Sequence, residues 1–284
     1  MKSSKVLYIP SGNINQIITH LQNKKFDLNI IDRYIVRLMG YPQQGWINIG
    51  QNRLNHGDFL YRLTTAKAAL VDVTLIPGET TYYFLNTLSK ELDLDRDKLQ
   101  KYYNQYTPLK EGAFVAETYK LPIGITEKKA IRILLYKSYQ QMKQWSKKIF
   151  GNFDEKKWFH FVTLASIIQK EAASVDDMYM VSSVMYNRLK KGMKLQMDGT
   201  LNYGRYSHIK ITSKRIKEDI SRYNTYRYKG LPPLPVCNVG IDAIKAAIFP
   251  AKSNYLYFVR TKEGKHKYTR YYSTHRRNIA NATK

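Results

Sequence analysis

One acidic side chain lies where the sequence could supply a general acid. Between Trp158 and Val175 the apolar residues recur at helical spacing, and Glu171 follows Leu164 by seven residues and Ile167 by four. This spacing predicts that Glu171 faces the interior. Burial disfavours the charged carboxylate, raises its pKa and keeps a proton available near neutral pH. A buried Glu neutralised by Arg or Lys is the structural alternative, and spacing alone leaves both interpretations open.

Two polar segments follow this helix. KLQMDGTLNYG (194–204) and SRYNTYRYKGLPPLPVCNVG (221–240) interleave aromatic rings with amide, hydroxyl and carboxylate groups. Rings can stack on the sugars of a polymer, and the polar groups can bond its hydroxyls and acetamides. The same mixture also occurs in ordinary loops, where Asp198 would cap a turn and Asn224 would brace the Pro-rich stretch.

The elements around Glu171 must hold it near an accessible surface. A second helix is predicted from Met178 to Leu189, with Asp176 and Asp177 near its start, where the helix dipole favours acidic residues. The two helices form a predicted hairpin with Glu171 near the connection. A side chain there can lose water and still reach a substrate.

The rest of the chain predicts an α+β fold in three parts. Residues 1–70 form an α/β lobe, 71–121 form a strand, helix, helix, strand unit, and 122–284 form a mixed α+β domain. The last part contains the central hairpin and a small β-sheet made from YLYFV and KHKYTRYY. The unit at 71–121 resembles the LysM type of glycan-binding module, and an α/β lobe without a ligand is the alternative.

Composition limits the function classes. The chain has 284 residues and a formal net charge of +25, which favours a polyanionic partner such as nucleic acid, anionic lipid or cell-wall polymer. No zinc-finger or RNP signature accompanies the charge, so we expect no nucleic acid partner. No run of eighteen apolar residues and no signal-peptide pattern are present.

Cysteine and histidine usage argues against metal chemistry. Cys237 is the only cysteine, so an internal disulfide and a thiolate metal cluster are excluded. We interpret Cys237 as a small apolar packing residue in a Pro-rich loop. The six His residues show no ligand spacing. We expect no metal and no cofactor.

The ordered motifs resemble one family. ASIIQKEAA, VMYNRLKKGMKLQMDGT, YNTYRYKGLPPLP and AAIFPAKSNYLYFV are similar to the MltG (YceG-like) endolytic murein transglycosylases, and EGAFVAETY resembles the family's lead-in to its catalytic domain. The resemblance covers residues 108–275 closely and the N-terminal lobe loosely. Gly199 departs from the Pro or other small residue usual after the Asp, which leaves the shape of that loop open.

The resemblance implies a chemistry and its residues. It implies cleavage between N-acetylmuramic acid and N-acetylglucosamine in nascent peptidoglycan, with attack by the sugar's own 6-hydroxyl and a 1,6-anhydromuramyl end. The family's catalytic Glu maps onto Glu171, as acid and then as base. The family's LQ-x-D-x-T and YNTY motifs imply substrate-binding roles for Gln196, Asp198, Thr200, Tyr223, Asn224, Thr225 and Tyr226.

The resemblance also implies a setting. It implies that the enzyme terminates glycan elongation and meets peptidoglycan synthases (penicillin-binding proteins) and elongation or division proteins. Family members carry a single-pass anchor in the bacterial inner membrane, with the catalytic domain facing the periplasm. We expect such an anchor to precede the N-terminal lobe.

Two other functions stay open. A hydrolytic muramidase would use water and a second carboxylate such as Asp198, and it would leave reducing ends. A non-catalytic peptidoglycan-binding or scaffold protein would bind sacculi regardless of Glu171.

Overall fold

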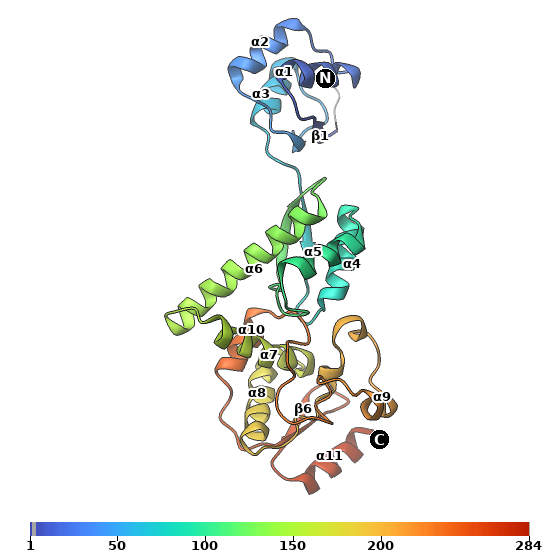
Figure 1. Ribbon diagram of the computed structural model, residues 1–284, viewed down its shortest axis with the longest axis vertical. Coiled ribbons are helices and arrows are strands. Elements are labelled where there is room, and N and C mark those ends of the chain that lie inside the picture. The colour runs from blue at the N-terminus through green and yellow to red at the C-terminus, as the bar shows by residue number, and fades with distance from the viewer. Residues whose placement is uncertain (2–3, 284) are drawn as a thin grey trace. The chain divides into compact units, whose positions relative to one another are not determined.

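The computed structural model describes residues 1 and 4–283 and shows a mixed α+β fold, about half helical, with small two-stranded sheets (Figure 1). The α+β class predicted from the sequence is confirmed. The chain forms two compact units, one of Met1–Val73 with Lys120–Thr126 and one of Thr74–Tyr119 with Glu127–Lys284. The division at 1–70, 71–121 and 122–284 stays a prediction.

The first unit pairs β1 (Val6–Ile9) antiparallel with β2 (Gly45–Asn48). Its helices are α1 (Ile14–Asn23), α2 (Ile30–Met39) and α3 (His56–Thr65). An Asn caps the start of each helix by accepting a bond from a backbone N–H of the first turn. One face of α1 is buried, and it consists of Ile14, Ile17, Ile18 and Leu21.

Two paired strands carry the chain across the boundary between the units. They are β3 (Leu70–Thr74) and β4 (Thr118–Pro122), and α4 (Thr81–Leu92) and α5 (Arg96–Tyr106) lie between them in sequence. The predicted order of strand, helix, helix and strand is therefore present at 70–122. The order β1, α1, α2, β2 repeats it in the first unit.

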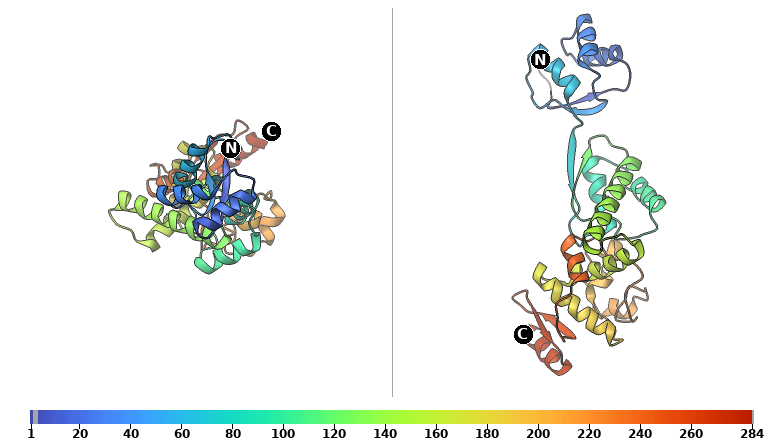
Figure 2. Two further views of the ribbon diagram at one scale, coloured as in Figure 1. Left: turned by 90° about the horizontal axis from the view of Figure 1, so that it is seen from above. Right: turned by 90° about the vertical axis from the view of Figure 1, so that its left-hand side faces the viewer.

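The second unit contains most of the helices (Figure 2). Besides α4 and α5 it holds α6 (Glu127–Phe150), α7 (Glu155–Glu171), α8 (Val175–Lys190), α9 (Ser213–Glu218), α10 (Ile241–Ile248) and α11 (Tyr272–Thr283), with 3-10 turns η1 (Asp198–Leu201) and η2 (Gly204–Tyr206). β5 (Tyr257–Arg260) and β6 (His266–Thr269) form an antiparallel pair. Among the described residues, no helix combines the length and apolar character that crossing a bilayer requires.

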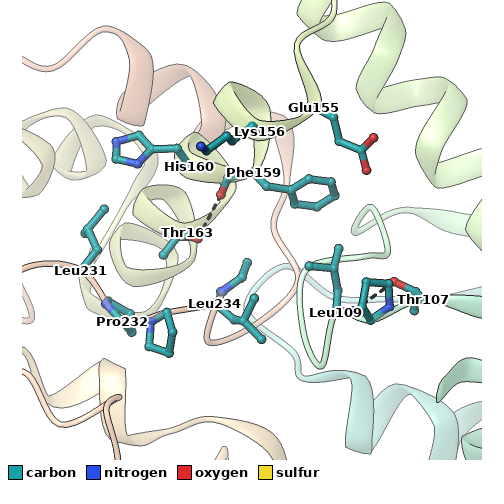
Figure 3. Close-up of a pocket in the computed structure, with 13 residues that line it drawn as sticks. Thr107, Leu109, Glu155, Lys156, Phe159, His160, Thr163, Leu231, Pro232 and Leu234 are labelled. Atoms are coloured by element: carbon teal, nitrogen blue, oxygen red, sulfur yellow. Dashed lines mark hydrogen bonds between the residues drawn. The ribbon is translucent and has the colours of Figure 1, made fainter.

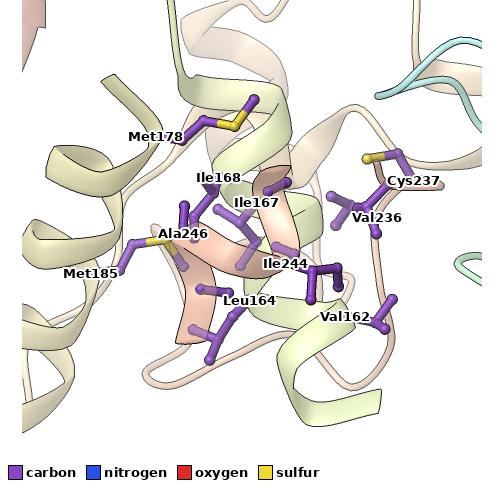
Figure 4. Close-up of a cluster of buried hydrophobic side chains, with 14 of the residues drawn as sticks. Val162, Leu164, Ile167, Ile168, Met178, Met185, Val236, Cys237, Ile244 and Ala246 are labelled. Carbon is purple, nitrogen blue, oxygen red and sulfur yellow. The ribbon is translucent and has the colours of Figure 1, made fainter. Parts of the chain in front are cut away.

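Helix α7 runs through the hydrophobic core of the second unit (Figure 4). Its apolar side chains include Leu164, Ile167 and Ile168, all without exposed surface. Small residues Ala243, Ala246 and Ala247 line α10, which packs closely on α7, and α8 adds Val181 and Met185. Because neighbours surround α7, its position is fixed by packing along most of its length.

The predicted C-terminal end of the central helix is wrong. Helix α7 ends at Glu171, not at Val175, because Ala172 has extended backbone angles (φ −66°, ψ 143°). Ser174 then caps α8 by accepting a 3.3 Å bond from the N–H of Asp177. This capping signal starts a new helix at Val175, so Glu171 stands at a corner between two helices.

Candidate functional site

Glu171 is the last residue of α7, and its side chain is partly buried. Its Oε1 accepts a 2.6 Å hydrogen bond from the backbone N–H of Gly199. Burial raises the pKa of Glu171 to about 7 and the Asp198 carboxylate adds to the rise, whereas the Gly199 bond, His266 and Arg188 oppose it. The helix C-terminus, with its partial negative charge, also disfavours a carboxylate here. Near neutral pH this group can donate a proton or accept one.

Gly199 fits against Glu171 with no room for a side chain. A Cβ atom at this position would lie 2.5 Å from Cβ of Lys170 and 3.0 Å from Oε1 of Glu171. Only glycine allows the backbone to approach the carboxylate this closely. The family that the motifs resemble usually has another residue at this position, and the glycine found here lets the backbone N–H reach the carboxyl group of Glu171.

The segment 196–200 presents two exposed polar side chains. Gln196 is exposed and has a positive φ of 50°, and Asp198 is exposed as well. The Tyr226 hydroxyl donates a 2.7 Å hydrogen bond to Oδ1 of Asp198. Thr200, by contrast, is fully buried, and its hydroxyl donates to the carbonyl of Met197 at 2.7 Å. Gln196 and Asp198 are thus exposed to solvent, whereas Thr200 fixes the segment to the protein interior.

Thr225 ties the two polar segments together. Its Oγ1 accepts a 3.0 Å bond from the N–H of Met197 and lies 3.0 Å from Oγ1 of Thr200. Its carbonyl accepts a 3.2 Å bond from the N–H of Gln196. Because Thr225 and Thr200 are buried, these bonds are shielded from water.

Asn224 and Tyr223 hold the second segment in place. The Asn224 amide is buried and donates to the carbonyls of Ile216 and Asp219 at 2.8 and 2.7 Å. The Tyr223 ring stacks on Tyr203 with centroids 4.4 Å apart, and burial raises the pKa of Tyr223 to about 12. Both side chains contact protein groups.

The structure therefore sorts the predicted residues into two groups. Hydrogen bonds or charge interactions link Glu171 with Asp198 and Tyr226, and Gln196 lies exposed on the same segment as Asp198. The buried side chains of Thr200, Asn224 and Thr225 make hydrogen bonds inside the protein, and the Tyr223 ring stacks on Tyr203. Direct glycan binding by any of these residues stays a prediction.

Sequence reasoning missed a carboxylate–imidazole pair beside the acid. Asp177 Oδ2 accepts a 2.9 Å bond from the N–H of Ala173 and lies 2.7 Å from Nδ1 of His266, and Oδ1 accepts a 2.5 Å bond from the Tyr268 hydroxyl. Burial raises the pKa of Asp177, but the bonds from His266 and Tyr268 outweigh it, and the pKa lies below its ordinary value. From the sequence we placed Asp177 only near the start of a helix, and no local sequence pattern links it to His266.

Arg188 is the second residue that the sequence did not single out. It is buried on α8, its Nε donates a 2.6 Å bond to the carbonyl of Leu256, and it also donates to the carbonyl of Leu195. Its guanidinium lies 5.3 Å from the centre of the Tyr257 ring. Arg188 thus joins the start of the 194–204 segment to β5 and adds positive charge near Glu171.

Cys237 has the surroundings of a packing residue. Its thiol is buried and donates to the carbonyl of Ser166 at 3.4 Å, and burial raises its pKa to about 12. Such a thiol is not a ready nucleophile. Across the residues the structure describes, no three His, Cys, Asp or Glu side chains group as ligands for a metal ion.

A cavity of about 650 Å³ lies near the other end of α7 (Figure 3). Phe159 and Thr163 line one side and the stretch from Leu231 to Pro235 lines another. Phe159 precedes Glu171 by twelve residues, which places the two Cα atoms roughly 18 Å apart along the helix. This cavity therefore does not contain the candidate acid.

Comparison with known proteins places the chain in a family. The YceG-like family matches residues 7–281. The chain belongs to the YceG-like family. A crystal structure of a yceG-like protein from Listeria monocytogenes has a TM-score of 0.64 and 26% identity, over 98% of this chain and 100% of that chain. The resemblance stated from the motifs is confirmed.

Two curated relatives of this YceG-like chain carry an activity in their names. An endolytic murein transglycosylase of Bacillus subtilis is 40% identical over 114 residues, which is 40% of this chain and 32% of the relative. One of Streptococcus pneumoniae is 36% identical over 127 residues, which is 42% of this chain and 23% of the relative. The match thus spans less than a third of either relative's length.

Proposed function

We propose that this chain is an endolytic lytic transglycosylase acting on peptidoglycan, with Glu171 as its general acid and base. The observation that carries the proposal is a partly buried carboxyl group with a pKa of about 7, held by the Gly199 N–H at the end of a rigid helix. The homology to endolytic murein transglycosylases over about 40% of the chain supports the substrate class.

The proposed reaction needs no water. Protonated Glu171 gives its proton to the glycosidic oxygen between N-acetylmuramic acid and N-acetylglucosamine, and the bond from the muramyl C1 to that oxygen breaks. The muramyl 6-hydroxyl then attacks C1, and the Glu171 carboxylate takes the hydroxyl proton. The products are a 1,6-anhydromuramyl end and a chain with a free N-acetylglucosamine 4-hydroxyl. One carboxyl group suffices because the nucleophile is internal.

The surrounding residues support these two proton transfers. Because Asp198 is bonded to Tyr226, its carboxylate is held in one place, from which its charge raises the pKa of Glu171. The buried bonds of Thr225 keep the Gly199 segment from shifting when the substrate binds. We assign Gln196, Asp198 and Tyr226 to glycan contact, and Thr200, Asn224 and Thr225 to support.

The setting is proposed on the family resemblance. We propose that residues 71–121 act as a LysM-like glycan-binding unit, that an anchor in the bacterial inner membrane precedes the catalytic domain on the periplasmic side, and that peptidoglycan synthases are partners. The strand, helix, helix, strand order at 70–122 supports the first of these.

Mass spectrometry of fragments released from purified sacculi tests the reaction. Wild type is expected to release anhydromuramyl ends, and Glu171→Gln to release none while its circular dichroism is unchanged. Products with reducing ends would identify a hydrolytic muramidase, for which the exposed Asp198 is the candidate second carboxylate. Retention on sacculi without release from either protein would overturn catalysis in favour of a binding module.

A further inference from the structure

Helix α2 of the first unit exposes a row of apolar side chains. Leu38 is 89% exposed and Tyr34 is 60% exposed, and Ile30, Ile31 and Tyr41 are each more than 60% exposed. In a helix Ile30, Tyr34 and Leu38 follow one another at four-residue steps and so lie on one side. We call Ile30, Ile31, Tyr34, Leu38 and Tyr41 the α2 stripe. Contiguous apolar surface of this kind marks an interaction site.

Polar contacts on the opposite side fix the direction of the stripe. Asp32 is 1% exposed, its Oδ1 lies 2.6 Å from Nε2 of His56 on α3, and its Oδ2 accepts a 2.7 Å bond from the N–H of Asn29. Val36 is also fully buried. If α2 rotated to bury Leu38, it would break the bonds of Asp32. The stripe therefore faces outward because of the fold.

The charge around the stripe is positive. Arg37 is exposed on α2 and Arg33 is partly exposed beside it. Residues 1–70 contain nine Lys and Arg but three Asp and Glu, and one of those three is the buried Asp32. Apolar side chains flanked by Arg are the pattern of a helix that lies in the surface of an anionic bilayer, where tyrosine rings are also favoured.

We propose that the α2 stripe docks on the surface of a bilayer that contains anionic lipid. Leu38 and Tyr34 enter the boundary between headgroups and acyl chains, and Arg33 and Arg37 remain at the phosphates. This docking requires no catalytic residue, and it holds whether or not the chain cleaves glycan.

Vesicle sedimentation of the full chain tests the docking. The wild type is expected to bind vesicles of equal parts phosphatidylglycerol and phosphatidylcholine, and to bind pure phosphatidylcholine weakly. Leu38→Ser and Tyr34→Ser should each weaken binding roughly ten-fold, because each removes an apolar side chain worth at least 1.4 kcal/mol in the bilayer. Arg37→Gln should weaken binding less, and its loss should vanish at high salt.

Matched variants control for general hydrophobicity. Tyr136→Ser and Ile220→Ser remove exposed apolar side chains in the second unit and should leave vesicle binding unchanged. Equal vesicle binding by wild type and Leu38→Ser would show that binding depends on charge alone, and it would overturn the proposal. Absence of vesicle binding overturns it too, and self-association that Leu38→Ser abolishes would then assign the stripe to a second copy of the chain.

Discussion

Glu171 experiences opposing influences at the scale of single residues. Burial, the helix C-terminus and Asp198 favour its protonated form, while Gly199, His266 and Arg188 favour the carboxylate. The balance leaves a pKa of about 7. In the proposed reaction Glu171 first donates and then accepts a proton, and a group in that role works best near such a balance, because neither state is strongly preferred.

Gly199→Ala should disable the site without removing any charged group. The new Cβ would lie 2.5 Å from Cβ of Lys170, so the segment must move and the bond to Glu171 lengthens. A hydrogen bond to a charged group contributes roughly 1.5–3 kcal/mol, so activity on sacculi should fall about 10- to 100-fold. Gly57→Ala, at a glycine with ordinary φ and no tight contact, is the control and should retain wild-type activity.

Replacing His266 should move the pH profile. Activity of the wild type should fall as the pH rises through about 7, because protonated Glu171 is lost. His266→Gln removes a positive charge that lowers the pKa of Glu171, while Gly199, Asp198 and Arg188 remain. The pH at which activity falls should therefore shift to a higher value. Rates of fragment release from pH 5 to 9 measure the shift. A lower rate with an unmoved limb would show that His266 has only a structural role.

The sequence could identify Glu171 but not its partners. Helical spacing relative to Leu164 and Ile167 is local, and it was enough to predict burial of the acid. The hydrogen bonds that Asp177 accepts from His266 and that Asp198 accepts from Tyr226 join residues far apart in the chain, and no periodic pattern encodes them. The close approach at Gly199 depends on atomic distances that residue types do not specify.

At the scale of elements, buried hydrogen bonds connect the two polar segments that lie beside Glu171. The segments 194–204 and 223–226 are joined through Thr225 and Thr200. Arg188 joins Leu195, near the start of the first segment, to Leu256, the residue before β5. The site is thus built on loops, but their bonds are buried. Helical spacing follows a period that the sequence shows, whereas the end of α7 depends on the cap at Ser174.

Thr225→Val tests this joint. Valine keeps the volume but leaves the N–H of Met197 without its acceptor, and an unsatisfied buried donor costs about 1–3 kcal/mol. We expect the free energy of unfolding in urea to fall by that amount and activity to fall as well. Thr225→Ser retains the hydroxyl and should keep most of the stability. Equal losses in both variants would contradict a role for the hydroxyl.

At the scale of the whole molecule, a second buried acid links stability to pH. Glu111 is 4% exposed, its Oε2 accepts a 2.7 Å bond from the N–H of Thr81, and burial raises its pKa to about 8. The folded state therefore binds a proton more tightly than the unfolded chain, in which an ordinary Glu titrates near pH 4.3. The stability contributed by this proton is lost as the pH rises from there through about 8.

Glu111→Gln should remove that dependence. The melting temperature of wild type should fall between pH 5 and pH 8 by more than that of Glu111→Gln, because glutamine carries no titrating group and can still accept the Thr81 bond. Calorimetry at several pH values gives the difference between the two proteins. Glu91→Gln, at an exposed position, should follow the wild type. Parallel curves for wild type and Glu111→Gln would contradict the assignment.

The crossing of the chain through β3 and β4 has a consequence for synthesis on the ribosome. The first unit needs Lys120–Thr126, whose Ile123 N–H bonds to the Ala69 carbonyl, and Gly124 lies against the Trp46 indole. Translation adds roughly 5–20 residues per second, so the unit waits about 3–10 s between the synthesis of Val73 and that of Thr126. During that interval α4 and α5 of the second unit are synthesised, so the first unit gains its last residues only after part of the second unit has been made.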